Sequence, residues 1–169
     1  GNHSGELFVK TPNKHTVYTT HSAPLFALHV DDKNQLWSGD GTGVVCMWSK
    51  QDHALRLEQK WTTDLGKIRH FSPHPKGLLI AGGSGQWSVL DDTGTLELGV
   101  QAHGRSCYWA LHLDAKNAVL SGGQDGQLQV HCAQENVLTL DVHQSAVYRG
   151  LIHEQTLWTC GRDKDVKAW

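Results

Sequence analysis

The chain contains 169 residues, with 15 Lys and Arg, 17 Asp and Glu, and a formal net charge of -2. This balance excludes a broadly basic surface of the kind that binds nucleic-acid phosphates without sequence specificity. No window approaches the roughly 18–20 uncharged apolar residues of a membrane span, and residues 1–4 lack the basic start and apolar stretch of a signal peptide.

The chain opens with a segment that is similar to the second half of the units that follow it. Residues 1–10 align with residues 122–131, and residues 15–20 align with the apolar segment that comes next. We therefore expect residues 1–20 to form the third and fourth strands of an incomplete unit.

Four units follow, and they open at His21, Thr62, His103 and His143, with steps of 41, 41 and 40 residues. A fixed period of this length, with several short apolar segments in each unit, indicates a repeat architecture. Each unit is too small to bury its own faces, so the units must stack on their neighbours. The predicted units are residues 21–61, 62–102, 103–142 and 143–169.

Within each unit the pattern predicts four short antiparallel strands. Apolar and polar residues alternate before the end of each third strand, as in Leu128, Gln129 and Val130, and this period of two is that of a strand with one buried face. Glycines between the second and third strands supply the positive backbone angles of hairpin turns. No segment has a sustained helical period, so the sequence predicts an all-β fold. The expected first strands are 25–30, 68–71, 108–113 and 147–152, and the expected fourth strands are 55–59, 95–100 and 137–141.

The polar residues that recur in these units resemble those of the WD-repeat β-propeller family. The family's unit has a His before the first strand, Ser or Thr on the second, Asp in the next turn and Trp at the end of the third. The last unit matches at all four positions with His143, Thr159, Asp163 and Trp169.

The other units depart from this tetrad to different extents. The third unit has His103, Ser121 and Asp125, with His131 in place of the Trp. The first unit has His21, Ser38 and Trp48, with Thr42 where the Asp is expected. The second unit is degenerate, because Thr62, Ala81 and Leu90 replace the His, the Ser and the Trp.

The resemblance implies four-stranded antiparallel blades in which hydrogen bonds join each tetrad. His, Ser or Thr, and Asp also occur together in hydrolase triads, but a group repeated from unit to unit indicates a structural role. No nucleophile-elbow motif occurs, so we expect no catalytic residue. An enzyme propeller would need converging carboxylates or arginines, or repeated Asp-box turns, and residues 38–42 only approach that pattern.

Four blades leave exposed sheet edges, whereas propellers of this family usually have seven blades. We therefore expect this chain to be a section of a larger propeller, or one that another chain completes. The four cysteines, Cys46, Cys107, Cys132 and Cys160, contain no CxxC pair. They predict scattered buried thiols and an intracellular location, cytoplasmic or nuclear, rather than disulfides.

The resemblance also implies a rigid scaffold for protein partners, with recognition on loops near the channel mouth. The best candidate contacts are the large aromatic and cationic residues Arg105, Trp109, Tyr148 and Arg149. Trp109 and Tyr148 lie in or beside first strands and could instead pack between blades. An RNA-associated propeller is the alternative, with Arg69, Lys76 and Arg105 serving locally.

Three histidines are expected to occupy the same position in successive first strands. His29, His70 and His112 are 41 and 42 residues apart, so their imidazoles could line the channel as a metal or proton-sensitive patch. Corresponding positions on neighbouring blades are commonly too far apart for one ion, and each His could instead be partly buried and bonded to backbone. We expect no metal site and no cofactor.

Overall fold

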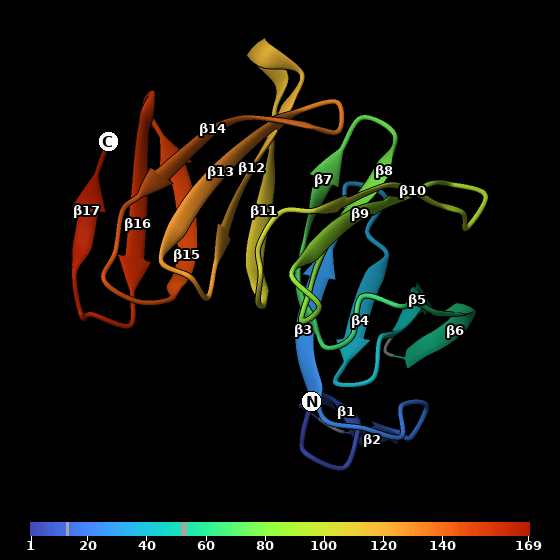
Figure 1. The fold of residues 1–169 in the computed structure, drawn as a ribbon. Helices are drawn as coiled ribbons and strands as arrows, with labels where there is room; N and C mark the ends of the chain where they lie inside the picture. The colour runs from blue at the N-terminus through green and yellow to red at the C-terminus, as the bar shows by residue number, and fades with distance from the viewer. Residues whose placement is uncertain (13, 52–53) are drawn as a thin grey trace. The chain divides into compact units, whose positions relative to one another are not determined.

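The computed structural model describes residues 1–12, 14–51 and 54–169, and its regular structure is almost entirely β (Figure 1). Residues 13, 52 and 53 of the predicted units lie outside the described residues. The helical element in the described part is one short 3-10 turn, η1 (Asp114–Lys116), and no helix there is long and apolar enough to cross a membrane. The predicted all-β fold is confirmed.

The chain divides into two compact units, Gly1–Ile68 and Arg69–Trp169. The first contains a hairpin, β1-β2, and a four-stranded antiparallel sheet of order β3-β4-β5-β6. The strands are β1 (Leu7–Thr11), β2 (Lys14–Tyr18), β3 (Leu25–Val30), β4 (Leu36–Asp40), β5 (Val44–Gln51) and β6 (Ala54–Thr62).

The core of the first unit lies between the hairpin and the sheet. Leu7 of β1 packs with Cys46 and Trp48 of β5, and the rings of Tyr18 and Trp48 meet edge-on with 5.6 Å between centroids. The Tyr18 hydroxyl also accepts a hydrogen bond of 2.7 Å from the backbone N–H of Leu55. The hairpin is therefore held by both apolar and polar contacts, as two strands of a neighbouring blade would be.

The second unit contains three antiparallel sheets, of which the last has three strands instead of four. The first sheet comprises β7 (Ile68–His74), β8 (Gly77–Gly82), β9 (Gln86–Leu90) and β10 (Leu96–Gln101), its first residue belonging to the preceding unit. The second comprises β11 (Cys107–Leu113), β12 (Ala118–Gly123), β13 (Gln127–Cys132) and β14 (Glu135–Asp141). The third comprises β15 (Val147–His153), β16 (Thr156–Gly161) and β17 (Val166–Ala168).

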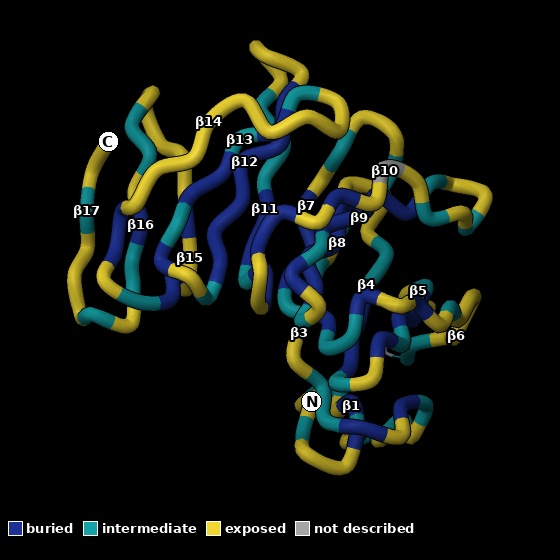
Figure 2. Tube along the Cα trace, in the orientation of Figure 1, coloured by how far each residue is buried: buried dark blue, intermediate teal, exposed yellow. Residues whose placement is uncertain are grey.

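Burial in the second unit follows from the stacking of these sheets face to face. One core cluster joins residues of β8 and β9 to residues of β11 and β12, and another joins β11–β13 to Val147 of β15. The Ser72 hydroxyl on β7 donates a hydrogen bond of 2.8 Å to the Ala110 carbonyl of the next sheet. Every residue of β12 is buried and every residue of β14 is exposed (Figure 2). β12 lies between β11 and β13, whereas β14 is the edge strand of the same sheet.

The first strands of three sheets share an irregularity near their starts. In β3, β11 and β15 the register shifts at the second residue, so that Phe26, Tyr108 and Tyr148 are each an extra residue opposite the next strand. A bulge of this kind turns one side chain out of the alternation of the strand. It thereby places an aromatic ring at the same end of each of these strands.

Candidate functional site

A buried hydrogen-bond network joins the tetrad residues of the β3–β6 sheet. His21 Nδ1 donates to Asp40 Oδ2 at 2.9 Å, and His21 Nε2 accepts from the Ser38 hydroxyl at 2.8 Å. Trp48 Nε1 donates to the same Ser38 oxygen at 2.8 Å. Thus a carboxylate, an imidazole, a hydroxyl and an indole form one chain of bonds.

The fourth member of this network is Asp40, whereas the sequence predicted Thr42 at that position. Thr42 lies in the turn where the Asp was expected, but its hydroxyl and its backbone N–H both donate to Asp40 Oδ1, at 2.9 and 2.8 Å. Burial by itself would raise the pKa of Asp40, but hydrogen bonds from Thr42, His21 and Val44 together lower it below its ordinary value. The signal that sequence reasoning missed was an Asp two residues after Ser38, close enough for its side chain to turn back onto His21.

The last sheet repeats the network with all four predicted residues. His143 Nδ1 donates to Asp163 at 2.9 Å, His143 Nε2 accepts from Thr159 at 2.9 Å, and Trp169 Nε1 donates to Thr159 Oγ1 at 3.0 Å. Hydrogen bonds to Asp163 from His143 and from the backbone of Gln144 outweigh the effect of burial and lower the pKa of this carboxyl.

The β11–β14 sheet has three of the four members of the network. His103 bonds Asp125 at 2.9 Å and Ser121 at 3.0 Å, and burial, opposed by Asp125, lowers the pKa of His103. In place of the indole, the His131 ring meets the Trp87 ring of the preceding sheet edge-on, 5.9 Å between centroids. No hydrogen-bond partner among the described residues faces His131 Nδ1.

These networks reproduce the order of bonds in a hydrolase triad, but burial prevents the hydroxyl from meeting a substrate. Ser38 and Ser121 are 0% exposed and Thr159 is 1% exposed, and the oxygens of Ser38 and Thr159 also accept an indole N–H. A nucleophile must reach the reacting atom and have a free lone pair. The networks therefore serve to pair polar side chains with one another where they are buried within the sheets.

In the β7–β10 sheet the network is absent, and the residue in the histidine position differs by one from the prediction. The backbone N–H groups of His103 and His143 donate to Gly85 and Gly126, and in the same way Thr63 donates to Gly43. Thr63, rather than Thr62, therefore replaces the His. Its buried hydroxyl donates to the Gly43 carbonyl at 2.9 Å.

The three histidines of the first strands do not share one position. His29 is opposite Trp37, the residue just before Ser38, whereas His112 is opposite Val119, two residues before Ser121. A difference of one residue places two side chains on opposite faces of their sheets. The expectation that the three histidines occupy the same position is therefore wrong. Among the described residues, no group of three or more His, Cys, Asp or Glu could hold a metal ion.

Trp109, one of the four predicted contact residues, is not on the surface. Its side chain is 0% exposed and belongs to the core cluster of β11–β13 and Val147. The indole lies between two glycines: a Cβ at Gly122 would be 2.4 Å from it and one at Gly150 on β15 would be 2.2 Å away. Trp109 fills the space between neighbouring sheets, so the contact prediction for this residue is wrong.

Arg105, Tyr148 and Arg149 are exposed, and they occupy three different kinds of position. Arg149 is opposite Cys160, as Trp109 is opposite Gly122, so Arg149 lies on the face of its sheet that corresponds to the face of Trp109. Tyr148 occupies the bulge at the start of β15, and Arg105 lies in the loop before β11.

A ladder of stacked side chains, absent from the prediction, runs across the three sheets of the second unit. The Arg69 guanidinium lies over the Tyr108 ring at 4.7 Å, and the Tyr108 and Tyr148 rings meet edge-on at 5.6 Å. Arg69 also donates to the Ser106 hydroxyl at 3.5 Å, beside the exposed Arg105. Arg69, Tyr108 and Tyr148, hereafter the arginine–tyrosine ladder, are the second residues of β7, β11 and β15.

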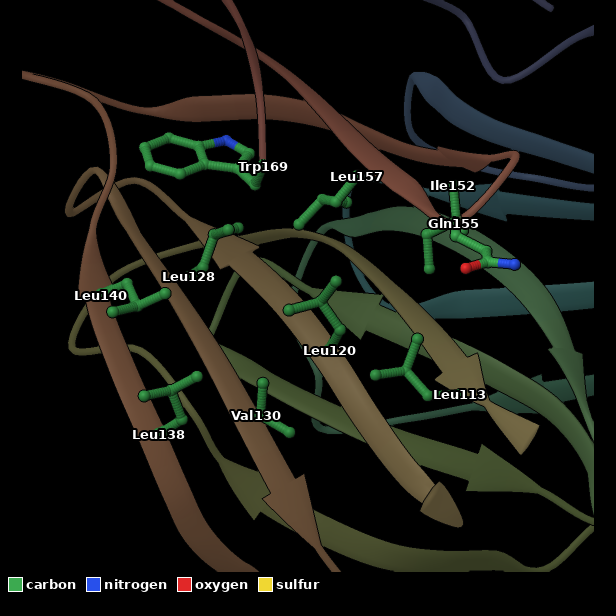
Figure 3. A pocket seen from close by; sticks show the side chains of 10 residues that line it. All are labelled: Leu113, Leu120, Leu128, Val130, Leu138, Leu140, Ile152, Gln155, Leu157 and Trp169. Carbon is green, nitrogen blue, oxygen red and sulfur yellow. The ribbon is translucent and has the colours of Figure 1, made fainter. Parts of the chain in front are cut away.

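An apolar groove of about 260 Å³ forms a second exposed surface, between the β11–β14 and β15–β17 sheets (Figure 3). Leu138 and Leu140 of β14 reach it from one side, and Trp169 reaches it from the other. These side chains are 45%, 43% and 50% exposed. The β15–β17 sheet on one side of the groove has three strands, whereas the β11–β14 sheet on the other side has four.

Comparisons with known proteins identify the fold. No model of a known protein family matches the chain, and no curated protein matches it. Its structure is similar to the WD40 β-propeller domain of Doa1, with a TM-score of 0.81 and 18% identity, over 99% of this chain and 59% of the other. A chain of the mitotic checkpoint complex matches with a TM-score of 0.80 and 17% identity, over 97% of this chain and 54% of that one.

A third similar structure is that of the computationally designed Ika4 protein, with a TM-score of 0.73 and 21% identity, over 88% of this chain and 92% of that chain. This chain thus spans 59% of the Doa1 chain and 54% of the mitotic checkpoint chain, but almost the whole of Ika4. At these identities the likeness concerns the fold. Together with the repeated sheets and their His–Ser/Thr–Asp networks, it establishes that the chain has the WD40 β-propeller fold.

Proposed function

We propose that the chain is a non-catalytic protein-interaction scaffold that binds a partner through the arginine–tyrosine ladder. The observation that supports this most is the stacking of Arg69, Tyr108 and Tyr148 across three successive innermost strands. Arginine and tyrosine are enriched among the residues that dominate interface energetics. Here they occur on strands whose backbone is fixed by the sheets, so little conformational freedom is lost on binding.

The chemistry of the ladder fits an acidic or aromatic segment of a partner. The Arg69 guanidinium places a positive charge over the Tyr108 ring, and this charge attracts a carboxylate. Arg105, exposed directly before Ser106, adds a second cation beside Arg69. Tyr148 is 47% exposed, so its ring offers apolar area and its hydroxyl offers a hydrogen bond.

The apolar groove supports a second part of the proposal, which concerns assembly. Exposed apolar area of this kind is usually covered in the working protein. We infer that a further strand, from the rest of a larger protein or from another subunit, pairs with β17 and covers Leu138, Leu140 and Trp169. Such a strand would complete the β15–β17 sheet to the four strands of its neighbours.

The proposal is tested by comparing partner capture by variants of matched stability. Tyr148→Ala and Arg105→Ala should each weaken capture of a specific partner by about 1–2 kcal/mol if they are interface hot spots. Arg56→Ala, at an exposed arginine on β6, is the control that should bind as the parent does. If the Tyr148→Ala/Arg105→Ala double variant recovers the same partners in the same amounts, the ladder is not the binding surface.

The RNA alternative makes a different prediction for the same residues. Tyrosine rings and arginines also stack on nucleic-acid bases, although the net charge of -2 provides little general attraction to phosphate. Binding of a single-stranded oligonucleotide that weakens with salt and is lost in Tyr148→Ala would favour an RNA-associated role. Turnover of a small substrate by the purified protein would overturn the scaffold proposal.

A further inference from the structure

A small cavity of about 140 Å³ lies between the β7–β10 and β11–β14 sheets, apart from the arginine–tyrosine ladder. Its walls come from the ends of the inner strands β7 and β11 and from the third strands β9 and β13. The polar residues that line it are His74, Lys76, Trp87, His112, Asn117 and His131. At about 30 Å³ for each water molecule, this space holds several waters or one small polyatomic ion.

Two buried nitrogen atoms among the lining residues have no hydrogen-bond partner in the described part of the chain. They are Trp87 Nε1 and His131 Nδ1, and their side chains are 1% and 3% exposed. A buried polar group without a partner costs about 1–3 kcal/mol. Trp87 Nε1–H can only donate, so a hydrogen-bond acceptor in the cavity would remove this cost, and His131 Nδ1 would donate as well in the tautomer that carries its proton there.

His131, which lines the cavity, occupies the position that a tryptophan has in two other sheets. In the first and last sheets, Trp48 and Trp169 extend their indoles to the hydroxyl of the network, at 2.8 and 3.0 Å. The imidazole of His131 is smaller, and it meets the Trp87 ring instead. The unpartnered His131 Nδ1 therefore belongs to a residue that departs from the repeated pattern.

His74 and His112, the other two histidines that line the cavity, are each oriented by hydrogen bonds. His74 Nδ1 accepts a hydrogen bond of 3.1 Å from the backbone N–H of Lys76, so in the neutral ring the proton is on Nε2, which can donate. Burial is the main cause that lowers the pKa of His74, and electrostatic interactions with His112 and Lys76 lower it further. His112 is oriented by its hydrogen bonds to Asp114 at 2.9 Å and to Asn117 at 3.4 Å.

A cation but no acid lines the cavity, although two acids outside it bond to lining residues. None of its lining residues is acidic, whereas Lys76 is a cation with a side chain that is 59% exposed. The pair that Lys76 forms with Glu97 is long, at 3.7 Å, and Glu97 is itself 44% exposed, so water screens it and it is weak. The nearest acid to the histidines, Asp114, is 93% exposed.

We propose that this cavity binds a small oxyanion, either inorganic phosphate or a carboxylate ion of similar size. Trp87 Nε1–H, the His131 imidazole and His74 Nε2–H would donate to its oxygens, and Lys76 would supply the opposite charge. A metal ion is a poor occupant, because the described histidines form no group with ligand geometry and an indole N–H cannot ligate.

The test is a titration of the purified chain with sodium phosphate and, separately, with sodium acetate, at constant ionic strength with sodium chloride. The readout is the indole N–H signal of Trp87 in ¹H–¹⁵N spectra, identified by its loss in Trp87→Phe or by backbone-linked assignment if that variant does not fold. We expect a saturable shift with an oxyanion and none with chloride. Whichever of phosphate and acetate saturates the shift at the lower concentration is the oxyanion that the cavity prefers.

Variants at exposed lysines make the test specific to the site. Lys76→Met should raise the dissociation constant about tenfold, because it removes a charged hydrogen-bond donor, whereas Lys50→Met on β5 should leave it unchanged. The proposal is overturned if neither oxyanion gives a saturable shift, or if both lysine variants bind equally. Saturable binding of Zn²⁺ that is lost in His74→Ala, without binding of phosphate or acetate, would also overturn it.

Discussion

Trp48 and Trp169 donate the same hydrogen bond in their own sheets but differ in burial. Trp48 is 1% exposed and packs against Leu7 and Cys46, whereas Trp169 is 50% exposed beside the apolar groove. The hydrogen bond is thus shared by the repeats, while the buried area depends on the neighbouring strands.

We therefore expect Trp48→Ala to lower the free energy of unfolding by about 3–5 kcal/mol. Trp169→Ala should cost less than half as much, because half of its side chain is already in water. His131→Ala should also cost less than Trp48→Ala, since the His is smaller and has no partner for Nδ1. Urea unfolding followed by circular dichroism measures all three, and equal losses at Trp48 and His131 would contradict the expectation.

Two neighbouring glycines provide a closely matched pair. A Cβ at Gly123 would lie 2.3 Å from His103 Nδ1, whereas one at Gly104 would have nothing within 4 Å. Gly123→Ala should push the His103 ring away from Asp125 and destabilise the chain by about 2 kcal/mol or more, because the buried network loses its geometry.

Gly104→Ala is the control for that substitution, and it should change the stability by no more than about 0.5 kcal/mol. Thermal unfolding of the two variants in parallel measures the difference. If Gly123→Ala is as stable as Gly104→Ala, the His103 network does not contribute to stability in the way described.

At the level of elements, equivalent positions in two sheets have different surroundings. Val100 is opposite Trp87 on β9, as Leu140 is opposite Leu128 on β13. Val100 is 5% exposed and Leu140 is 43% exposed. Val100 belongs to a core cluster with Ala110 and Val119 of the next sheet, whereas Leu140 lines the open apolar groove.

This difference in burial predicts that truncation of Val100 costs more stability than truncation of the larger Leu140. Val100→Ala should cost about 1.5–3 kcal/mol, and Leu140→Ala should cost less than about 1 kcal/mol in the isolated chain. Chemical unfolding of each variant gives the values. A greater loss at Leu140 would mean that the groove is already covered, for instance by a second copy of the chain, which sedimentation velocity would detect.

At the level of the whole molecule, each compact unit contains one cysteine that is fully buried. Burial raises the pKa of the Cys46 thiol to about 11, and burial raises the pKa of Cys107 strongly as well. Cys132 and Cys160 are partly exposed. Because the thiolate is the form that reacts with alkylating agents, Cys46 and Cys107 should be inert in the folded chain at pH 8.

Alkylation by iodoacetamide at increasing urea concentrations can therefore follow the two units separately. Cys132 and Cys160 should react without urea. Cys46 should become reactive at a lower urea concentration than Cys107, because its unit has one four-stranded sheet and a hairpin, whereas the unit of Cys107 stacks three sheets. Mass spectrometry of the peptides reads both sites, and the reverse order would show that the first unit is the more stable.

The sequence by itself determined the strand pattern and the repeat of about 40 residues, because local alternation and spacing are displayed directly by a single chain. The WD40 β-propeller fold was predicted from the resemblance of the tetrad residues to that family, and the similarity to solved structures supports it. The residues of the last tetrad were likewise readable, because His143, Thr159, Asp163 and Trp169 occupy the positions typical of the repeat, and their hydrogen bonds are present in the structure.

Only the tertiary structure decided which side chains meet. Asp40 rather than Thr42 bonds His21 because a carboxylate two residues after Ser38 can turn back across the hairpin. Trp109 is buried because Gly150 of the next sheet leaves room for its ring. Tyr108 reaches both Arg69 and Tyr148 because a bulge turns it out of its strand. Register, bulges and stacking between sheets set these contacts. The spacing of residues within one repeat does not reveal them.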